Sequence, residues 1–296
     1  MTRLGVKIEE EMLVRKARRI PTQGEVYVEE GDIVEPDKVI ARGVAINPEM
    51  CEVKVFARLG VEPDRVERHM LKKEGDEVKK DEAIAIYRAF FGRLTKVCRS
   101  PVDGTIEVFL RASGRVLIRG MPIPIETRAH IPGRIVELIP GEGAVVETRA
   151  AIINGIFGVG GEARGELVVA VDRPGEALTT EVVEERHGGK ILVGGSLVTL
   201  EALWKAVKIG VSGIITGGVE QKDLTDFLGY EIGMGVTGGE KAGLTLIITE
   251  AFGINPMDYD TFRLLKSHEG KQVSIDGTTQ IRQRMLRPEI IIPLQN

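Results

Sequence analysis

The stretch LKKEGDEVKKDEAIA, residues 71–85, contains the turn and the strand from which the fold of this chain is predicted. Glycine supplies the positive φ angle that a tight turn needs, and an aspartate side chain hydrogen-bonds the neighbouring backbone, so Gly75-Asp76 predicts a turn. A similar sequence occurs earlier as YVEEGDIVEPDKVIA, residues 27–41, with its matching residues at a fixed offset of 44. Two copies at one offset predict a duplicated β unit.

A second repeat follows the first. Gly104-Thr105-Ile106 returns as Gly133-Arg134-Ile135, and each copy has apolar residues alternating on either side of a glycine-containing loop. This pattern predicts a β-hairpin in each copy. We therefore expect the chain from about residue 21 to 170 to be all β, apart from a helical turn near residues 62–68.

These motifs resemble a known module. A Gly-Asp-x-Val turn, an apolar strand and then Ser100-Pro101-x-x-Gly104 are similar to the barrel-sandwich hybrid of biotinyl and lipoyl carrier domains, over about residues 24–119. Similar modules occur in ion-pumping electron-transport complexes and in the large subunits of bacterial RNA polymerase. The chain as a whole resembles a prokaryotic protein family with no assigned activity.

The resemblance implies a carrier lysine at a hairpin tip, eight residues before the proline of the Ser-Pro pair. Arg93 occupies that position here, and Lys96 is out of register. An arginine is neither biotinylated nor lipoylated. We therefore expect no cofactor attachment, and we expect the module to act as a scaffold.

Composition limits the classes of protein. The chain has 296 residues, 43% of them hydrophobic, and no apolar run approaches the roughly 20 residues of a membrane span. No secretory signal precedes the acidic residues 9–11, so we expect a cytoplasmic protein without a membrane partner. Cys51 and Cys98 are expected to be reduced, and the four histidines show no metal-binding spacing. We predict no cofactor and no metal.

The sequence pattern changes after about residue 180. Short apolar strands ending in Gly-Gly alternate with amphipathic helices, one of them capped by Thr199, which predicts a mostly parallel sheet. The predicted fold is a multi-domain α and β protein: a barrel-sandwich hybrid-like β domain at 1–128, a small β barrel or hairpin extension at 129–180, and an α/β domain at 181–296.

Ligands of open parallel sheets bind beyond the carboxyl ends of the strands. There, Gly-Gly pairs allow backbone N–H groups to approach a small anion, hydroxyl groups supply donors, and one carboxylate is available as an acid or base. The alternative is that the glycines only permit close packing, since no phosphate-loop pattern is complete. The candidate ligand-binding residues are Gly194, Gly195, Ser196, Thr216, Gly217, Gly218, Thr249 and Glu250.

Three functions follow from these observations. The first is a non-catalytic binding or scaffold protein for a small anionic ligand or a protein partner. The second is an enzyme in which Glu250 acts as acid or base. The third is a transcription- or translation-associated nucleic-acid-binding protein, indicated by the resemblance to the RNA-polymerase module and by the arginines near the C-terminus, Arg282, Arg284 and Arg287. A net charge of −4 and 4% aromatic residues do not favour this third function.

Overall fold

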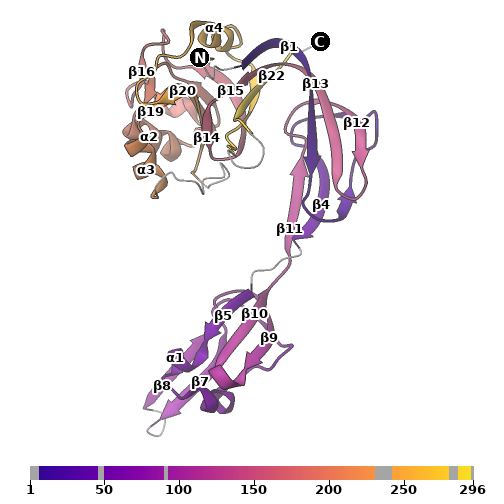
Figure 1. The fold of residues 1–296 in the computed structure, drawn as a ribbon, viewed down its shortest axis with the longest axis vertical. Helices are drawn as coiled ribbons and strands as arrows, with labels where there is room; N and C mark the ends of the chain where they lie inside the picture. The colour runs from indigo at the N-terminus through magenta and orange to yellow at the C-terminus, as the bar shows by residue number, and fades with distance from the viewer. Residues whose placement is uncertain (1–6, 46–49, 90–92, 231–241, 280–285, 295–296) are drawn as a thin grey trace, which may run out of the picture. The chain divides into compact units, whose positions relative to one another are not determined.

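The computed structural model describes residues 7–45, 50–89, 93–230, 242–279 and 286–294, and most of its regular structure is β. The chain divides into two compact units. Unit 1 comprises residues 1–18, 28–40 and 128–296, and unit 2 comprises residues 19–27 and 41–127. Both units are discontinuous in sequence, unit 1 with three segments and unit 2 with two; Figure 1 colours the chain by residue number.

Unit 1 contains a 13-stranded mixed sheet. Its main path runs β14-β20-β19-β17-β15-β21-β22-β13-β12-β3, with β1 paired to β13 and β16 and β18 joined at β19. The strands are β1 (Lys7–Arg19), β3 (Ile33–Val34), β12 (Gly133–Ile139), β13 (Gly143–Asn154), β14 (Phe157–Val159), β15 (Glu162–Val169), β16 (Ala177–Leu178), β17 (Ile191–Val193), β18 (Leu197–Val198), β19 (Gly213–Val219), β20 (Thr245–Phe252), β21 (Gln272–Asp276) and β22 (Glu289–Pro293).

The sheet is mixed rather than mostly parallel. Strands β15, β17, β19 and β20 run parallel to one another, as the strand–helix alternation predicts. However, β14, β21 and β22 pair antiparallel with their neighbours. Sequence periodicity cannot reveal this direction, because hairpin strands and crossover strands have the same apolar residues when both faces are buried.

Three helices belong to the parallel strands: α2 (Leu200–Ile209), α3 (Gln221–Leu228) and α4 (Tyr259–Ser267), with a 3₁₀ turn η4 (Glu185–His187) before β17. The predicted cap of α2 is present, because the Thr199 side chain accepts a hydrogen bond from the Ala202 N–H. Asp258 caps α4 in the same way, accepting from the N–H groups of Asp260 and Thr261.

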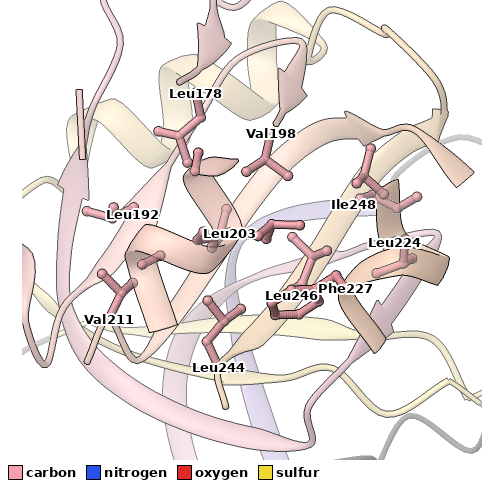
Figure 2. Close-up of a cluster of buried hydrophobic side chains, with 14 of the residues drawn as sticks. Leu178, Leu192, Val198, Leu203, Val211, Leu224, Phe227, Leu244, Leu246 and Ile248 are labelled. Atoms are coloured by element: carbon pink, nitrogen blue, oxygen red, sulfur yellow. The ribbon is translucent and has the colours of Figure 1, made fainter. Parts of the chain in front are cut away.

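The parallel strands bury side chains on both faces because successive residues point to opposite sides. Leu192, Ile214 and Leu246 join the core under α2 and α3, which Figure 2 shows around Leu203 and Phe227. Ile191, Ile215 and Ile247, one position away in each strand, join a second core with Phe262 and Leu265 of α4. These two cores explain why the strands are continuous apolar runs.

Unit 2 contains three small sheets, ordered β5-β10-β9-β6, β11-β4-β2 and β7-β8. Their strands are β2 (Gly24–Val26), β4 (Val39–Ala45), β5 (Met50–Lys54), β6 (Glu77–Val78), β7 (Ala83–Ala89), β8 (Leu94–Arg99), β9 (Gly104–Leu110), β10 (Arg115–Gly120) and β11 (Ile123–Arg128). Helix α1 (Val55–Leu59) and the 3₁₀ turns η1 (Pro63–His69) and η3 (Arg111–Ser113) accompany them. The turn η1 occurs where a helical turn is expected.

The two Gly-Asp turns make the same contacts. The Gly31 N–H donates to the Ile135 carbonyl and the Gly75 N–H to the Ile106 carbonyl, both at 2.8 Å. In each turn the aspartate side chain accepts from the backbone N–H three residues earlier, Asp32 at 2.9 Å and Asp76 at 2.7 Å. Each turn therefore bonds to one of the two predicted hairpins: the Gly31 turn to the hairpin that begins at Gly133, and the Gly75 turn to the hairpin that begins at Gly104. In sequence, the second of these turn–hairpin pairs lies between the two parts of the first.

Strands β7 and β8 pair antiparallel from Ala83–Arg99 to Ala89–Leu94, on either side of the position at which a carrier lysine was considered. Arg93 is exposed in the turn immediately before β8. Among the described helices, none is both long enough and apolar enough to cross a membrane.

Candidate functional site

The structure brings the predicted strand-end residues together at one edge of the parallel strands. The Gly217 N–H donates to the Gly195 carbonyl at 2.8 Å, and the Thr249 hydroxyl donates to the Thr216 carbonyl at 3.4 Å. Ser196, Thr216 and Thr249 are all buried. The prediction that neighbouring strands deliver these residues to one place is therefore consistent with the register of β17, β19 and β20.

The chain's own backbone occupies the space beside the glycines. A Cβ atom at Gly195 would overlap the Glu176 carbonyl, one at Gly217 the Asn255 carbonyl, and one at Gly218 the Gly253 carbonyl. The Ser196 hydroxyl donates to the Gly175 carbonyl at 2.9 Å. Glycine is thus required here for close backbone approach, which is the packing role that we set against ligand binding.

Glu250 also has a structural role. Its Oε1 atom accepts from the Asp258 N–H at 3.0 Å and from the Thr249 hydroxyl at 3.3 Å. Asp258 is the residue that caps α4. The carboxylate therefore ties the end of β20 to the beginning of α4.

A pocket of about 420 Å³ lies elsewhere in unit 1, beside the second half of β15. Its apolar lining comes from residues 167–170 and Val182. Val168, Ala170 and Val182 are half-buried and pack against the α2–α3 core of Figure 2. The polar lining comes from β15, from the segment before β17 and from the end of the α4 region: Glu166, Glu181, Glu184, Arg186, His187, Lys190 and Glu269. Its volume is within the range of small-molecule sites, and more of its lining is polar than apolar.

His187 is the most enclosed polar side chain of this lining, only 3% exposed. Its Nδ1 atom accepts a hydrogen bond from the Glu184 N–H at 3.1 Å. Burial, and next the charge of Arg186, lower the pKa of His187, so the ring is neutral at pH 7. A neutral ring that accepts at Nδ1 carries its hydrogen on Nε2.

The Nε2 edge of His187 is available to a ligand. This atom has no hydrogen-bond partner within the described ranges, and it is not one of the fully enclosed unpartnered atoms there. His187 is one of the residues that line the pocket, so this unpartnered N–H donor belongs to the pocket lining. Lys190 and Glu166, 3.0 Å apart, and Arg186 and Glu184, 2.9 Å apart, form ion pairs around it.

A second polar group of unit 1 gathers around His130, which is 9% exposed. Its Nδ1 atom lies 3.7 Å from Glu162, whose carboxylate receives two hydrogen bonds from Arg18. Burial lowers the pKa of His130 despite the negative charge of Glu162. Its Nε2 atom is enclosed without a partner. His130 is therefore a buried histidine, and His187, which ends η4, is buried as well.

The basic residues near the start of the chain are ion-paired. Arg15 pairs with Glu147, Lys16 with Glu289 and Arg18 with Glu162. These carboxylates neutralise three of the cations that cluster near the start of the chain. Arg282 and Arg284 lie outside the described residues.

Sequence reasoning did not identify the pocket beside β15. Its polar residues come from three segments separated by up to about a hundred positions, and only Glu184 and His187 form a local signal. Their spacing of three matches a capping box, which the structure contains. No local pattern indicates that Glu166, Glu181 and Glu269 converge on them.

Comparison with known proteins adds no family. No protein-family model matches the chain, and no curated protein or solved structure matches it significantly.

Proposed function

We propose that this chain is a binding protein for a small molecule, which occupies the pocket beside β15. The observation that carries the proposal is the free Nε2–H donor of His187 in the lining of this pocket, where the ring is held by the bond from the Glu184 N–H to Nδ1. A ring fixed at one nitrogen presents the other in a constant direction, and preorganised donors of this kind reduce the ordering cost of binding.

We propose a binding protein rather than an enzyme because most of the charged groups in the lining are already engaged. Lys190 pairs with Glu166 and Arg186 with Glu184, and Glu269 accepts from the Val169 N–H at 3.2 Å. Catalysis requires a nucleophile or base within hydrogen-bond reach of a partner that activates it. His187 donates toward the pocket instead of accepting there.

Nuclear magnetic resonance of the histidine rings tests this proposal, because the chain has only four histidines. The His187 signal is assigned from its loss in a His187→Asn variant. We expect a metabolite library to contain compounds that shift the His187 signal and raise the melting temperature of the wild-type chain. Compounds that stabilise the chain while leaving the His187 signal in place would contradict the pocket as the binding site.

For unit 2 we propose the scaffold role that the carrier-like resemblance implies. It is supported by the β7–β8 hairpin and by Arg93 in the turn before β8. The expected intact mass of the chain purified from its native source is that of the unmodified polypeptide. A mass increase corresponding to biotin or lipoate would contradict the scaffold role. The small anion expected at the strand ends stays a prediction, tested by whether inorganic phosphate protects residues 194–196 from hydrogen exchange.

A further inference from the structure

The charges that line the pocket beside β15 do not balance. Four carboxylates, of Glu166, Glu181, Glu184 and Glu269, face two cations, Arg186 and Lys190. With His187 neutral, two negative charges remain in excess at pH 7. A concave site with low-dielectric walls concentrates the field of such an excess, so it attracts cations and repels anions.

One carboxylate of the lining remains available. Glu166 and Glu184 are paired with Lys190 and Arg186, and Glu269 accepts a backbone N–H. Glu181 makes no hydrogen bond or ion pair with any residue that the structure describes. It is therefore the carboxylate that is open to a ligand cation, whereas both cations of the lining already have a carboxylate partner.

The apolar residues of the lining and the His187 donor indicate the other two parts of the ligand. The floor formed by Val168, Ala170 and Val182 is apolar, so it accepts a hydrocarbon body. The His187 Nε2–H is a donor, so the ligand needs an acceptor such as a hydroxyl oxygen near it.

We infer that the ligand is a small organic cation, with an ammonium group at Glu181, a short hydrocarbon body over β15 and a hydrogen-bond acceptor at His187. This inference rests on the proposed function, since it names the ligand class of the same pocket. An amino alcohol is the simplest molecule with these three parts.

A matched set of probes tests each part. Aminopentanol has the ammonium and the hydroxyl, pentylamine lacks the hydroxyl, pentanediol lacks the charge, and hydroxypentanoate reverses it. Titrations followed at the His187 ring signal should rank aminopentanol first and pentanediol about tenfold weaker, because a charge-assisted hydrogen bond is lost. Hydroxypentanoate should be the weakest of the four.

Two variants and one control assign the contacts. Glu181→Gln should weaken aminopentanol about tenfold and leave pentanediol unchanged. His187→Asn keeps an acceptor for the Glu184 N–H but removes the ring donor. It should therefore abolish the tighter binding of aminopentanol relative to pentylamine. Binding to this variant is measured by the shift in its melting temperature, because the ring signal is absent. The control Glu185→Gln changes an exposed carboxylate of η4 that does not line the pocket, and it should bind all four probes like the wild type.

The outcomes separate the inference from the proposed function. Hydroxypentanoate binding as tightly as aminopentanol, with a shifted His187 signal, would overturn the cationic ligand and leave the pocket as the site. The same conclusion follows if none of the four probes moves the His187 signal while other library compounds do. If no compound of any charge moves that signal, the pocket and the inference both fail.

Discussion

Arg18 and Glu162 form a bidentate ion pair although they lie 144 positions apart in the sequence. The two guanidinium nitrogens Nη1 and Nη2 contact the two carboxylate oxygens at 2.5 and 2.8 Å. Arg18 Nε donates to the Arg128 carbonyl at 2.6 Å. This planar geometry joins β1 to β15 through side chains alone, since the two strands are not neighbours in the sheet.

Removing Arg18 should destabilise the chain. The Arg18 side chain is 13% exposed and the Glu162 side chain 39%, so the pair lies between a buried and a surface ion pair. We expect Arg18→Met to lower the free energy of unfolding by about 1–3 kcal/mol, measured by urea denaturation. Arg15→Met is the matched control. Arg15 is on β1, like Arg18, and pairs with Glu147, but its side chain is 65% exposed, so its loss should cost less than about 1 kcal/mol. Equal losses would contradict a special role for the Arg18 pair.

Acid should destabilise the fold through His130. Burial lowers the pKa of His130 below its ordinary 6.5, so the unfolded chain binds a proton more readily than the folded chain. The free energy of unfolding should therefore fall as the pH falls below 6.5 and continue falling until the lowered pKa is reached, by at most about 1.4 kcal/mol per pH unit for one proton. Urea midpoints measured across this range report the slope.

His130→Asn isolates that contribution. Asparagine tolerates the positive φ of 66° at this position, so the backbone is retained. The slope below pH 6.5 should become shallower in this variant, and His187→Asn should remove a separate share, because burial also lowers the pKa of His187. An unchanged slope in His130→Asn would refute the assignment.

Glu162 should extend the loss of stability to lower pH. Burial acts to raise its pKa, but the Arg18 hydrogen bonds and the charges of His130, Arg18 and Lys16 bring it below 4.5. The carboxylate therefore stabilises the fold above pH 4.5, and this contribution is lost as the pH falls through the lowered pKa. A Glu162→Gln variant should show a smaller loss of stability than the wild type below that pH, measured by the same titration.

Gly217 should not accept a side chain. Because a Cβ atom there would overlap the Asn255 carbonyl, Gly217→Ala should lower the free energy of unfolding by about 2–4 kcal/mol. Gly175→Ala is the control, since nothing lies within 4 Å of its Cβ position, and it should change stability by less than about 0.5 kcal/mol. If Gly217→Ala folds only when produced at low temperature, the recovered protein should still show a lower thermal midpoint than Gly175→Ala. Similar midpoints would show that the strand ends have room for a ligand.

Glu250 should matter for stability through its bond to α4. Glu250→Ala removes the acceptor of the Asp258 N–H and should cost about 1 kcal/mol in urea denaturation. Glu250→Gln keeps an oxygen acceptor and should cost less. If a reaction is found for this chain and Glu250→Gln abolishes it without loss of stability, the enzymatic hypothesis would replace the structural role.

The sequence by itself determined the features that depend on a few neighbouring residues. The Gly31 and Gly75 turns, the hairpins of both copies and the Thr199 cap were predictable because their hydrogen bonds lie within a short segment. The apolar runs of β17, β19 and β20 were predictable because both faces of these strands are buried. Their alternation with helices correctly indicated parallel neighbours.

Tertiary structure decided what depends on register between distant segments. The antiparallel pairing of β21 and β22, the Arg18–Glu162 pair and the convergence of Glu166, Glu181 and His187 on one pocket each join parts of the chain with no common local pattern. The same is true of Gly195 and Gly217: the sequence shows that a close approach is allowed there, but not whether a ligand or the backbone makes it. The physical reason is that a glycine or a charged side chain determines which kinds of contact are possible at its position. The packing of the whole sheet determines which group makes that contact.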